Sequence, residues 1–357
     1  MTDVDLLIAE STDLLQQLIR TTSYSREEAE TADIITQFLI NAEIPSERIG
    51  NNVIAYNKYF EDSKPTILLN SHHDTVKPNP AYTKDPFLPQ IEDGKLFGLG
   101  SNDAGGCLVS LIAAFRYFNE LQDLPFNLCL LASAEEEVSG KGGVEEAYKY
   151  LKPCNFAIVG EPTLLDLAIA EKGLMVLDCE AIGEAGHAAR NEGVNAIYQA
   201  LEDIHWFQTY EFPKKSASLG PVKMSVTMIE AGSQHNVVPA SCKFVVDVRT
   251  TDAYNNEEVL QIIKENIRSV VQARSTRLNP SSIPMDHPIV KAGLALGKKT
   301  YGSPTMSDQA LLSIPSVKVG PGDSARSHSA DEFIYLKEID EGIRFYIALL
   351  ENIKSGI

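Results

Sequence analysis

Histidine and carboxylate side chains, the groups that most often bind metal ions, recur in this chain directly after short apolar runs. The runs span 66–69, 127–131, 156–159 and 316–319 and are typical of β-strands. The groups that follow them are, in chain order, His72 with Asp74, Glu135–Glu137, Glu161 and His328. Because polar groups at the carboxyl ends of adjacent strands meet in one crevice of an open α/β sheet, we expect these side chains to lie together.

Asp103 adds a further carboxylate, in the glycine-rich turn Gly98–Asp103 ahead of a helical segment. Two histidines and at least four carboxylates in one crevice would repel one another unless cations lay between them, so the sequence predicts a pair of metal ions. A dinucleotide-binding turn is excluded, because Asp103 stands where the third glycine of that fingerprint belongs and would repel a pyrophosphate.

Each candidate has a structural alternative. A single histidine is more often structural than a metal ligand, and His205 and His287 fit that interpretation. His72 does not, because Asp74 lies two residues further on the same side of a strand and can orient the imidazole. Glu135–Glu137 could be a solvated charge run, but it follows a strand that we expect to be buried and leads into a glycine-rich turn.

Composition narrows the class of protein. The chain has 357 residues, of which 44% are hydrophobic and 22% charged, as in ordinary globular proteins with room for two domains. The net charge of −18 argues against binding to nucleic acid or to anionic membrane surfaces.

The five cysteines show no metal-binding spacing and mostly lie inside apolar runs, which favours reduced, buried thiols. The acidic start of the chain does not resemble a signal peptide, and no apolar stretch is long enough to span a membrane. We therefore expect a cytoplasmic protein.

The order of expected elements predicts an α/β protein with an inserted module. An apolar helical stripe (Leu6, Leu7, Leu14, Leu15 and Leu18) opens the chain, and Ser25–Glu28 reads as a capping box that starts a second helix. Strand, turn and helix signals then alternate to about residue 173 and resume at 283, which predicts one discontinuous metal-bearing domain, 1–173 with 283–357, around a mostly parallel sheet flanked by helices. Residues 174–282 read as strand 175–182, helix 194–208, strands 222–229 and 242–248, and helix 256–273, the order of a ferredoxin-like α+β module.

Seven short motifs, in the right order, make the chain resemble the zinc-dependent amidohydrolases and exopeptidases that include acetylornithine deacetylase, succinyl-diaminopimelate desuccinylase, aminoacylase and carboxypeptidase G. The motifs are Ser71–Asp74, Gly98–Gly106, Glu135–Glu137, Gly160–Thr163, His187 with Gly193–Ile197, Asn236–Pro239 with Asp247–Arg249, and His328 with Asp331–Glu332. The resemblance covers nearly the whole chain.

The resemblance implies a ligand set. One ion would bind His72, Asp103 and Glu161, and the other Asp103, Glu137 and His328, with Asp103 bridging. The ions would be two Zn²⁺, with Co²⁺ or Mn²⁺ as possible substitutes. A zinc-bridged hydroxide would attack an amide carbonyl, and Glu136 would be its general base. The peptide bond after the bridging Asp103 is expected to be cis.

The resemblance also implies that Asp74 supports His72 and that the inserted module is a lid and dimerisation domain. His187 would stabilise the oxyanion in the active site of the partner subunit of a homodimer. Arg249 would bind the α-carboxylate of the substrate and Asn236 would add a hydrogen bond, although a surface ion pair and a turn are the structural alternatives for these two.

The function that the resemblance implies is amide hydrolysis of an N-acyl amino acid, and acetylornithine deacetylase of arginine biosynthesis is the best functional match. The alternatives are deacetylation of N-acetylcitrulline, desuccinylation of an N-succinyl amino acid and dipeptide hydrolysis. An alternative of another class is a non-catalytic ligand-binding protein. Leu99, Gly105 and Met306 depart from the family pattern near the pocket, which leaves the acyl group and the side-chain preference open.

Overall fold

A computed structural model describes residues 3–356 and divides the chain into two compact units. The first unit comprises the described residues of Met1–Ile169, Ser282–Tyr301 and Ser307–Ile357, and the second comprises Ala170–Ser281 and Gly302–Met306. Residues 302–306 were expected to belong with the flanking parts of the chain. The segment joins the second unit because Gly302 packs so closely on Ser218 that a Cβ would lie 2.2 Å from the carbonyl oxygen of Ser218.

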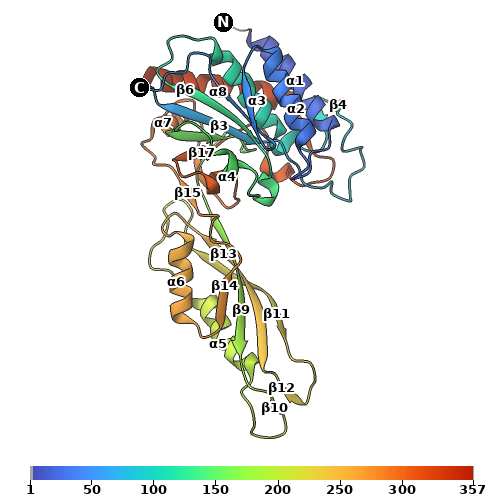
Figure 1. Cartoon of the computed structure of the whole chain (residues 1–357), viewed down its shortest axis with the longest axis vertical. Coiled ribbons are helices and arrows are strands. Elements are labelled where there is room, and N and C mark those ends of the chain that lie inside the picture. Colours follow the sequence, from blue (N-terminus) through green and yellow to red (C-terminus); the bar gives the residue numbers. More distant parts are fainter. Residues whose placement is uncertain (1–2, 357) are drawn as a thin grey trace. The chain divides into compact units, whose positions relative to one another are not determined.

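The first unit is built on a mixed sheet whose centre is parallel (Figure 1). β3 (Thr66–His72) pairs in parallel with β6 (Asn127–Ser133) and β7 (Phe156–Val159), and β17 (Ser316–Lys318) extends the parallel part beyond β7. All residues of these four strands are buried, as expected of a parallel sheet covered on both faces. The remaining strands of this sheet are β1 (Ser46–Ile49), β2 (Asn52–Tyr56), β8 (Leu167–Glu171), β15 (Ser281–Ser282) and β16 (Thr300–Ser303). Residues 170–171, 281 and 302–303 of these strands are counted with the second unit.

Alternation along the strands separates two layers of core. Ile67 and Leu69 of β3 face the large hydrophobic cluster, whereas Leu68 between them faces a smaller one. The large cluster is covered by α1 (Val4–Arg20), α2 (Ala29–Asn41), α3 (Gly106–Asn119), α7 (Pro288–Ala295) and α8 (Leu336–Gly356). The short α4 (Val144–Ala147) covers the smaller cluster. A three-stranded sheet of β4 (Gln90–Glu92), β5 (Lys95–Phe97) and β18 (Phe333–Tyr335) completes the unit. The fold class predicted from the sequence is confirmed.

Two details of the N-terminal helices differ from the prediction. The stripe of α1 is buried at Leu7, Leu14, Leu15 and Leu18, but Leu6 is 52% exposed because it lies beside the stripe and not within it. The capping box was wrong: α2 begins at Ala29, and its N-cap residue Glu28 makes no side-chain cap hydrogen bond. The Ser25 hydroxyl donates instead to Asp74 Oδ2 at 2.6 Å, a partner 49 residues away.

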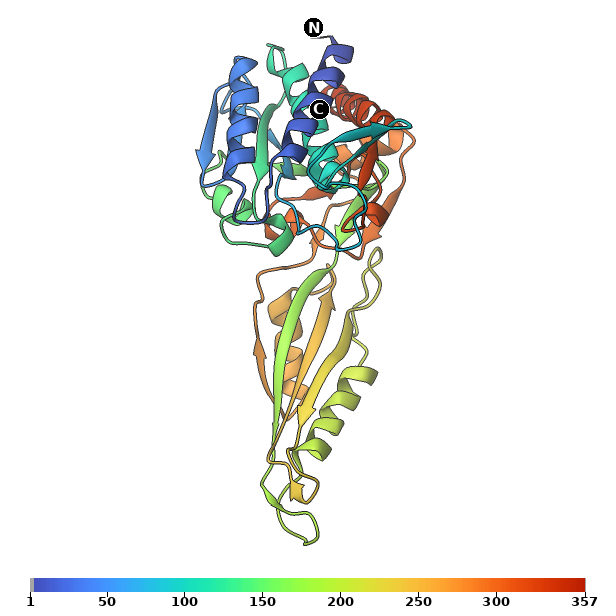
Figure 2. The same ribbon diagram turned by 90° about the vertical axis from the view of Figure 1, so that its right-hand side faces the viewer.

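The second unit is a four-stranded antiparallel sheet with two helices on one face (Figure 2). The strand order is β11 (Lys223–Ala231), β13 (Ser241–Thr250), β9 (Gly173–Ile182) and β14 (Val270–Ala273). α5 (Ala196–Thr209) and α6 (Asn256–Asn266) pack on the same hydrophobic cluster. The predicted helix 256–273 was too long, because the chain leaves the helix at Ile267 and the β-branched pair Val270–Val271 adds a strand to β9.

The cysteines and the helices bear on the expectations of reduced thiols and of no membrane span. All five cysteines are free, and Cys107, Cys129, Cys179 and Cys242 are buried. Among residues 3–356, no helix has the length and apolar character that a membrane crossing requires.

Asn256 is a buried side chain of the second unit with several hydrogen bonds, and we predict that Asn256→Ala destabilises this unit. Its amide donates to the carbonyl oxygens of Thr276 at 3.0 Å and Leu278 at 2.8 Å, and its oxygen accepts from Thr250 Oγ1 at 2.7 Å. The truncation removes this partner from all three groups, and only the Leu278 oxygen keeps another donor, the N–H of Leu174, so the free energy of opening should fall by about 2–3 kcal/mol.

Hydrogen exchange of the β9 and β13 amides measures this effect without requiring the whole chain to unfold in one step. Asn266→Ala is the matched control, because Asn266 is exposed at the other end of α6 and should change the opening free energy by less than about 0.5 kcal/mol. Equal protection in the two variants would contradict the role given to Asn256.

Candidate metal centre

The candidate ligands of the first unit gather at the carboxyl ends of its parallel strands. His72 is the last residue of β3, Glu136 and Glu137 begin the short 3₁₀ helix Glu136–Val138 after β6, and Glu161 follows β7. His328 lies in the segment after β17. This placement is the one that the open-sheet rule predicts.

His72 lies at the centre of the cluster. Its Nε2 is 3.5 Å from Asp103 Oδ1, 3.7 Å from Glu161 Oε1 and 3.9 Å from Glu136 Oε2. Its other nitrogen, Nδ1, is 3.0 Å from the backbone oxygen of Asp74 and 3.4 Å from the carboxylate of the same residue. Asp74 therefore fixes the ring so that Nε2 points toward the carboxylates.

Asp103 lies between the two histidines. While Oδ1 faces His72, Oδ2 is 3.6 Å from His328 Nε2, and that nitrogen is 2.9 Å from Glu137 Oε2. One carboxylate thus contributes an oxygen to each of two groups of donors. This is the geometry that a bridging ligand requires.

The loop that carries Asp103 is held by a residue whose role sequence reasoning missed. The buried carboxylate of Glu332 accepts the backbone N–H groups of Gly100 at 3.1 Å, Asn102 at 2.8 Å and Asp103 at 2.9 Å. The Asp103–Ala104 peptide bond is cis, as expected. Glu332 formed part of a late motif, but only the folded chain shows that it fixes the loop from 229 or more residues away.

Asp308 is a second residue near the cluster that was not predicted from the sequence. It is 3% exposed, and it accepts a hydrogen bond from Ser133 Oγ at 2.6 Å at the end of β6. Burial raises its pKa to about 6 even though the Ser133 hydroxyl and the charge of His72 act in the opposite direction. Asp308 therefore adds another carboxylate to those near His72.

The pKa values of the cluster are shifted in the direction that reduces its negative charge. Burial raises the pKa of Glu161 to about 8 and holds the pKa of Glu136 well above its usual range. The hydrogen bond to Glu137 raises the pKa of His328 to about 9. Burial opposes the charged form of His72, but its contacts with Asp103 and Asp74 raise its pKa well above the ordinary value. Without a cation, the cluster balances its charge by taking up protons.

The donor set fits divalent metal ions. Two groups bring one ligand atom from each of three residues within 4.8 Å of one another: His72, Asp103 and Glu137, and His72, Glu136 and Glu161. Imidazole nitrogen combined with carboxylate oxygen suits Zn²⁺, Co²⁺ or Mn²⁺. Glu136, predicted as the base and not as a ligand, lies 3.9 Å from His72 Nε2, slightly farther than Asp103 at 3.5 Å and Glu161 at 3.7 Å.

The other candidate residues belong to the second unit. His187 is exposed in β10 (Gly186–His187), which pairs with β12 (Val237–Val238), and the N–H of Ala188 donates to the oxygen of Asn236 at 3.0 Å. These two candidates are therefore neighbours. Arg249 of β13 is held by Asp247, through Nε at 2.9 Å and Nη2 at 3.1 Å, so the ion pair considered as its structural alternative is present.

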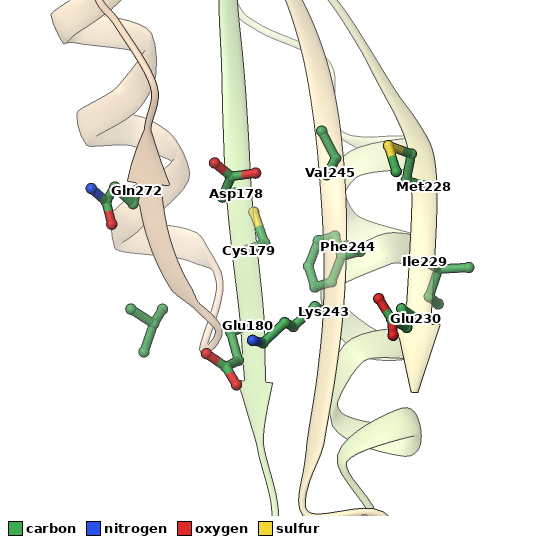
Figure 3. A pocket seen from close by; sticks show the side chains of 11 residues that line it. Asp178, Cys179, Glu180, Met228, Ile229, Glu230, Lys243, Phe244, Val245 and Gln272 are labelled. Atoms are coloured by element: carbon green, nitrogen blue, oxygen red, sulfur yellow. The ribbon is translucent and has the colours of Figure 1, made fainter. Parts of the chain in front are cut away.

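Two further features do not belong to the metal centre. His287 is structural as predicted, because it caps α7 and packs on Phe156. A cavity of about 600 Å³ lies on the sheet of the second unit, between side chains such as Asp178, Glu180, Met228 and Lys243 (Figure 3). None of the candidate ligands lines this cavity.

Comparison with known proteins gives the family. The family described as Peptidase family M20/M25/M40 matches residues 68–352. Acetylornithine deacetylase of Proteus mirabilis (strain HI4320) is 29% identical over 377 aligned residues, which cover 95% of this chain and 96% of the relative. The LysW-lysine/LysW-ornithine hydrolase of Sulfurisphaera tokodaii is 26% identical, over 85% of this chain and 86% of that protein.

Solved structures show the same fold. The aminopeptidase PepT of Bacillus cereus has a TM-score of 0.75 at 18% identity, over 98% of this chain and 99% of the other. The YXEP protein of Bacillus subtilis, described as a dinuclear metal binding peptidase from the M20 family, has a TM-score of 0.75 at 16% identity, over 99% and 100% of the two chains. With the match over 68–352, these findings establish that the chain belongs to peptidase family M20/M25/M40 and is a metal-dependent hydrolase.

Proposed function

We propose that this hydrolase cleaves the amide bond of an N-acyl amino acid, and that its substrate is N-acetylornithine, an intermediate of arginine biosynthesis. The observation that carries the proposal is the Asp103 carboxylate, with Oδ1 directed at His72, Oδ2 directed at His328, and Glu136 beside them. The acetylornithine deacetylase relatives support the choice of substrate.

The metal ligands would be His72, Asp103 and Glu161 on one side, and Asp103, Glu137 and His328 on the other, with Zn²⁺ as the ion that we propose. When bound, the two ions supply Lewis acidity, which acidifies a water molecule and polarises the scissile carbonyl. Asp74 keeps His72 oriented by holding its Nδ1 at 3.0 Å from a backbone oxygen. Glu332 keeps Asp103 in place through three backbone N–H groups.

Glu136 would be the general base. Its carboxylate is 14% exposed and lies 3.9 Å from His72 Nε2, so it faces the same space as the ligands without being needed in either expected set. Burial raises its pKa, which increases its strength as a base. It would take a proton from the attacking water and return it to the departing amine.

The second unit would supply substrate contacts. Asp247 engages Nε and Nη2 of Arg249, so the Nη1 group is the part of the fork that would bind the α-carboxylate of the substrate. Asn236 would add a hydrogen bond. His187 of the partner subunit would stabilise the oxyanion in a homodimer, which fits the exposure of its side chain.

Exposed apolar side chains on the second unit support self-association. Tyr198 and Leu201 of α5 are 68% and 52% exposed, and Met228 and Ile229 of β11 are 65% and 57% exposed. β11 is also an edge strand of its sheet, and an exposed edge strand can pair with another chain.

We place the reaction in the cytoplasm, where the five free thiols would stay reduced.

We predict that the metal-loaded protein deacetylates N-acetylornithine and that Glu136→Gln lowers kcat by about 100-fold to 10,000-fold, because an amide cannot accept the proton. The assay panel contains the N-acetyl and N-succinyl forms of ornithine and citrulline, together with dipeptides. Metal content is measured in the same samples, and Glu136→Gln should retain its metal.

Glu30→Gln, an exposed substitution on α2, is the control and should match the wild type. Preference for another member of the panel would overturn the acetylornithine assignment and keep the reaction class. A metal-loaded protein that cleaves nothing in the panel would favour the ligand-binding alternative.

The raised pKa values of the cluster predict how the stability of the metal-free protein depends on pH. The pKa values of Glu161, about 8, and His328, about 9, lie above the ordinary values of roughly 4.3 and 6.5 that the unfolded chain would show. The metal-free folded state therefore binds more protons than the unfolded state between about pH 4 and pH 9, and its stability falls as the pH rises through this window.

Metal ions replace these protons, so metal binding should become tighter as the pH rises. We expect the difference in Tm between metal-loaded and chelated protein to widen from pH 6 to pH 9, as measured by thermal scans at matched ionic strength. A difference that stays constant across this range would show that the metal does not bind at these groups.

A further inference from the structure

The turn that carries Glu136 is anchored by carboxylates from outside it. Each of the three successive backbone N–H groups of Glu135–Glu137, here called the base turn, donates to a carboxylate oxygen. The N–H of Glu135 donates to Glu28 Oε1 at 3.2 Å, that of Glu136 to Asp74 Oδ1 at 3.0 Å, and that of Glu137 to Asp74 Oδ2 at 3.2 Å. The position of the base turn therefore depends on two acidic side chains.

The backbone of the base turn adopts unfavourable φ angles, so it requires support from outside. Glu135 has a φ of 55°, in the left-handed region that side chains other than glycine rarely adopt. The following 3₁₀ helix has only three residues, Glu136–Val138, and ends at Ser139 with a φ of 44°. A segment with two such residues is held in place by its surroundings and not by its own backbone preference.

Glu28 is an unusual residue to find buried. Its exposure is 0%, and its carboxylate accepts hydrogen bonds from the N–H of Arg26, from Asn51 Nδ2 at 2.9 Å and from the N–H of Glu135. Burying a carboxylate is unfavourable unless donors surround it. The ordinary use of this residue, as the fourth member of a capping box, is ruled out because it makes no cap hydrogen bond.

Ser25 supports the second anchor. Its hydroxyl donates to Asp74 Oδ2 at 2.6 Å, the same oxygen that accepts the N–H of Glu137. The segment that carries Ser25 and Glu28 is tied to the end of β3 through Thr31 Oγ1, which is 2.8 Å from His73 Nδ1. Segment and turn are thus both fixed next to His72.

We propose that Ser25 and Glu28 are positioning residues for the general base: together with Asp74 they fix the base turn so that the Glu136 carboxylate faces the metal centre. The proposal rests on the proposed function of Glu136 as the base. It assigns a catalytic consequence to the segment before α2, although neither residue is expected to touch the substrate or a metal ion.

The first test is Glu28→Gln, measured on the metal-loaded protein with the substrate that the panel identifies. A glutamine keeps the size of the side chain, but its NH₂ group cannot accept the bonds that one carboxylate oxygen now receives. We expect kcat to fall by about 10-fold to 100-fold with KM changed less than about threefold, since a small misplacement of a catalytic group has effects of this size. Glu27→Gln, one residue away and exposed, is the control and should behave as the wild type.

The second test is independent of catalysis. Hydrogen exchange of the peptide over 134–139 should be faster by about tenfold or more in Glu28→Gln than in the wild type, whereas Glu27→Gln should leave it unchanged. Ser25→Ala, a smaller change that preserves the fold if Glu28→Gln does not, should also accelerate exchange in this peptide.

These two readouts separate the two proposals. If the wild type hydrolyses nothing, the proposed function fails while the exchange experiment still tests the anchoring. Unchanged exchange over 134–139 in both Glu28→Gln and Ser25→Ala would overturn the positioning role, as would an unchanged kcat in an active enzyme.

Discussion

The concentration of negative charge at the carboxyl ends of β3, β6 and β7 is the constraint on which the rest of the first unit depends. Asp103, Glu136, Glu137 and Glu161 all lie around His72, with side chains at most 14% exposed. Such a group is stable only if protons or cations balance it, and the raised pKa values of Glu161 and His328 show that protons do so in the absence of metal. Divalent ions would balance the same negative charge in place of the protons, and they would also supply Lewis acidity for hydrolysis.

The surrounding structure supplies backbone N–H groups and carboxylates that hold the cluster together. Glu332 fixes the Asp103 loop through three N–H groups, and Asp74 holds both His72 and two N–H groups of the base turn. Both anchors are buried carboxylates. Backbone N–H groups surround Glu332, whereas Asp74 also has His72 beside it, and against the effect of burial this neighbour lowers the pKa of Asp74. One side-chain cation lies close to the cluster: Lys318, the last residue of β17, is 4% exposed, and its charge acts against burial to lower the pKa of Glu161.

The sequence predicted well what depends on local pattern and strand order. Apolar runs followed by His72, Glu136, Glu161 and His328 foretold both the parallel sheet and the meeting of these residues. The features that could not be predicted depend on contacts between distant segments. Ser25 fits the sequence pattern of a helix cap, but its hydroxyl donates to Asp74 instead. Glu332 accepts hydrogen bonds from a loop more than 200 residues away. The strand Val270–Ala273 was read as helix because its pairing with β9 could not be seen in the local pattern. The roles of His187, Asn236 and Arg249 stay predictions.

We propose that Asp103 is shared between two metal ions. Crystals grown with Zn²⁺ and measured at the zinc absorption edge, together with metal analysis of the dialysed protein, test it most directly. If Asp103 bridges two ions, there should be two anomalous peaks, one on the His72 side of Asp103 and one on the His328 side, and both should be lost in Asp103→Asn. A single peak, or two peaks that persist in Asp103→Asn, would contradict it.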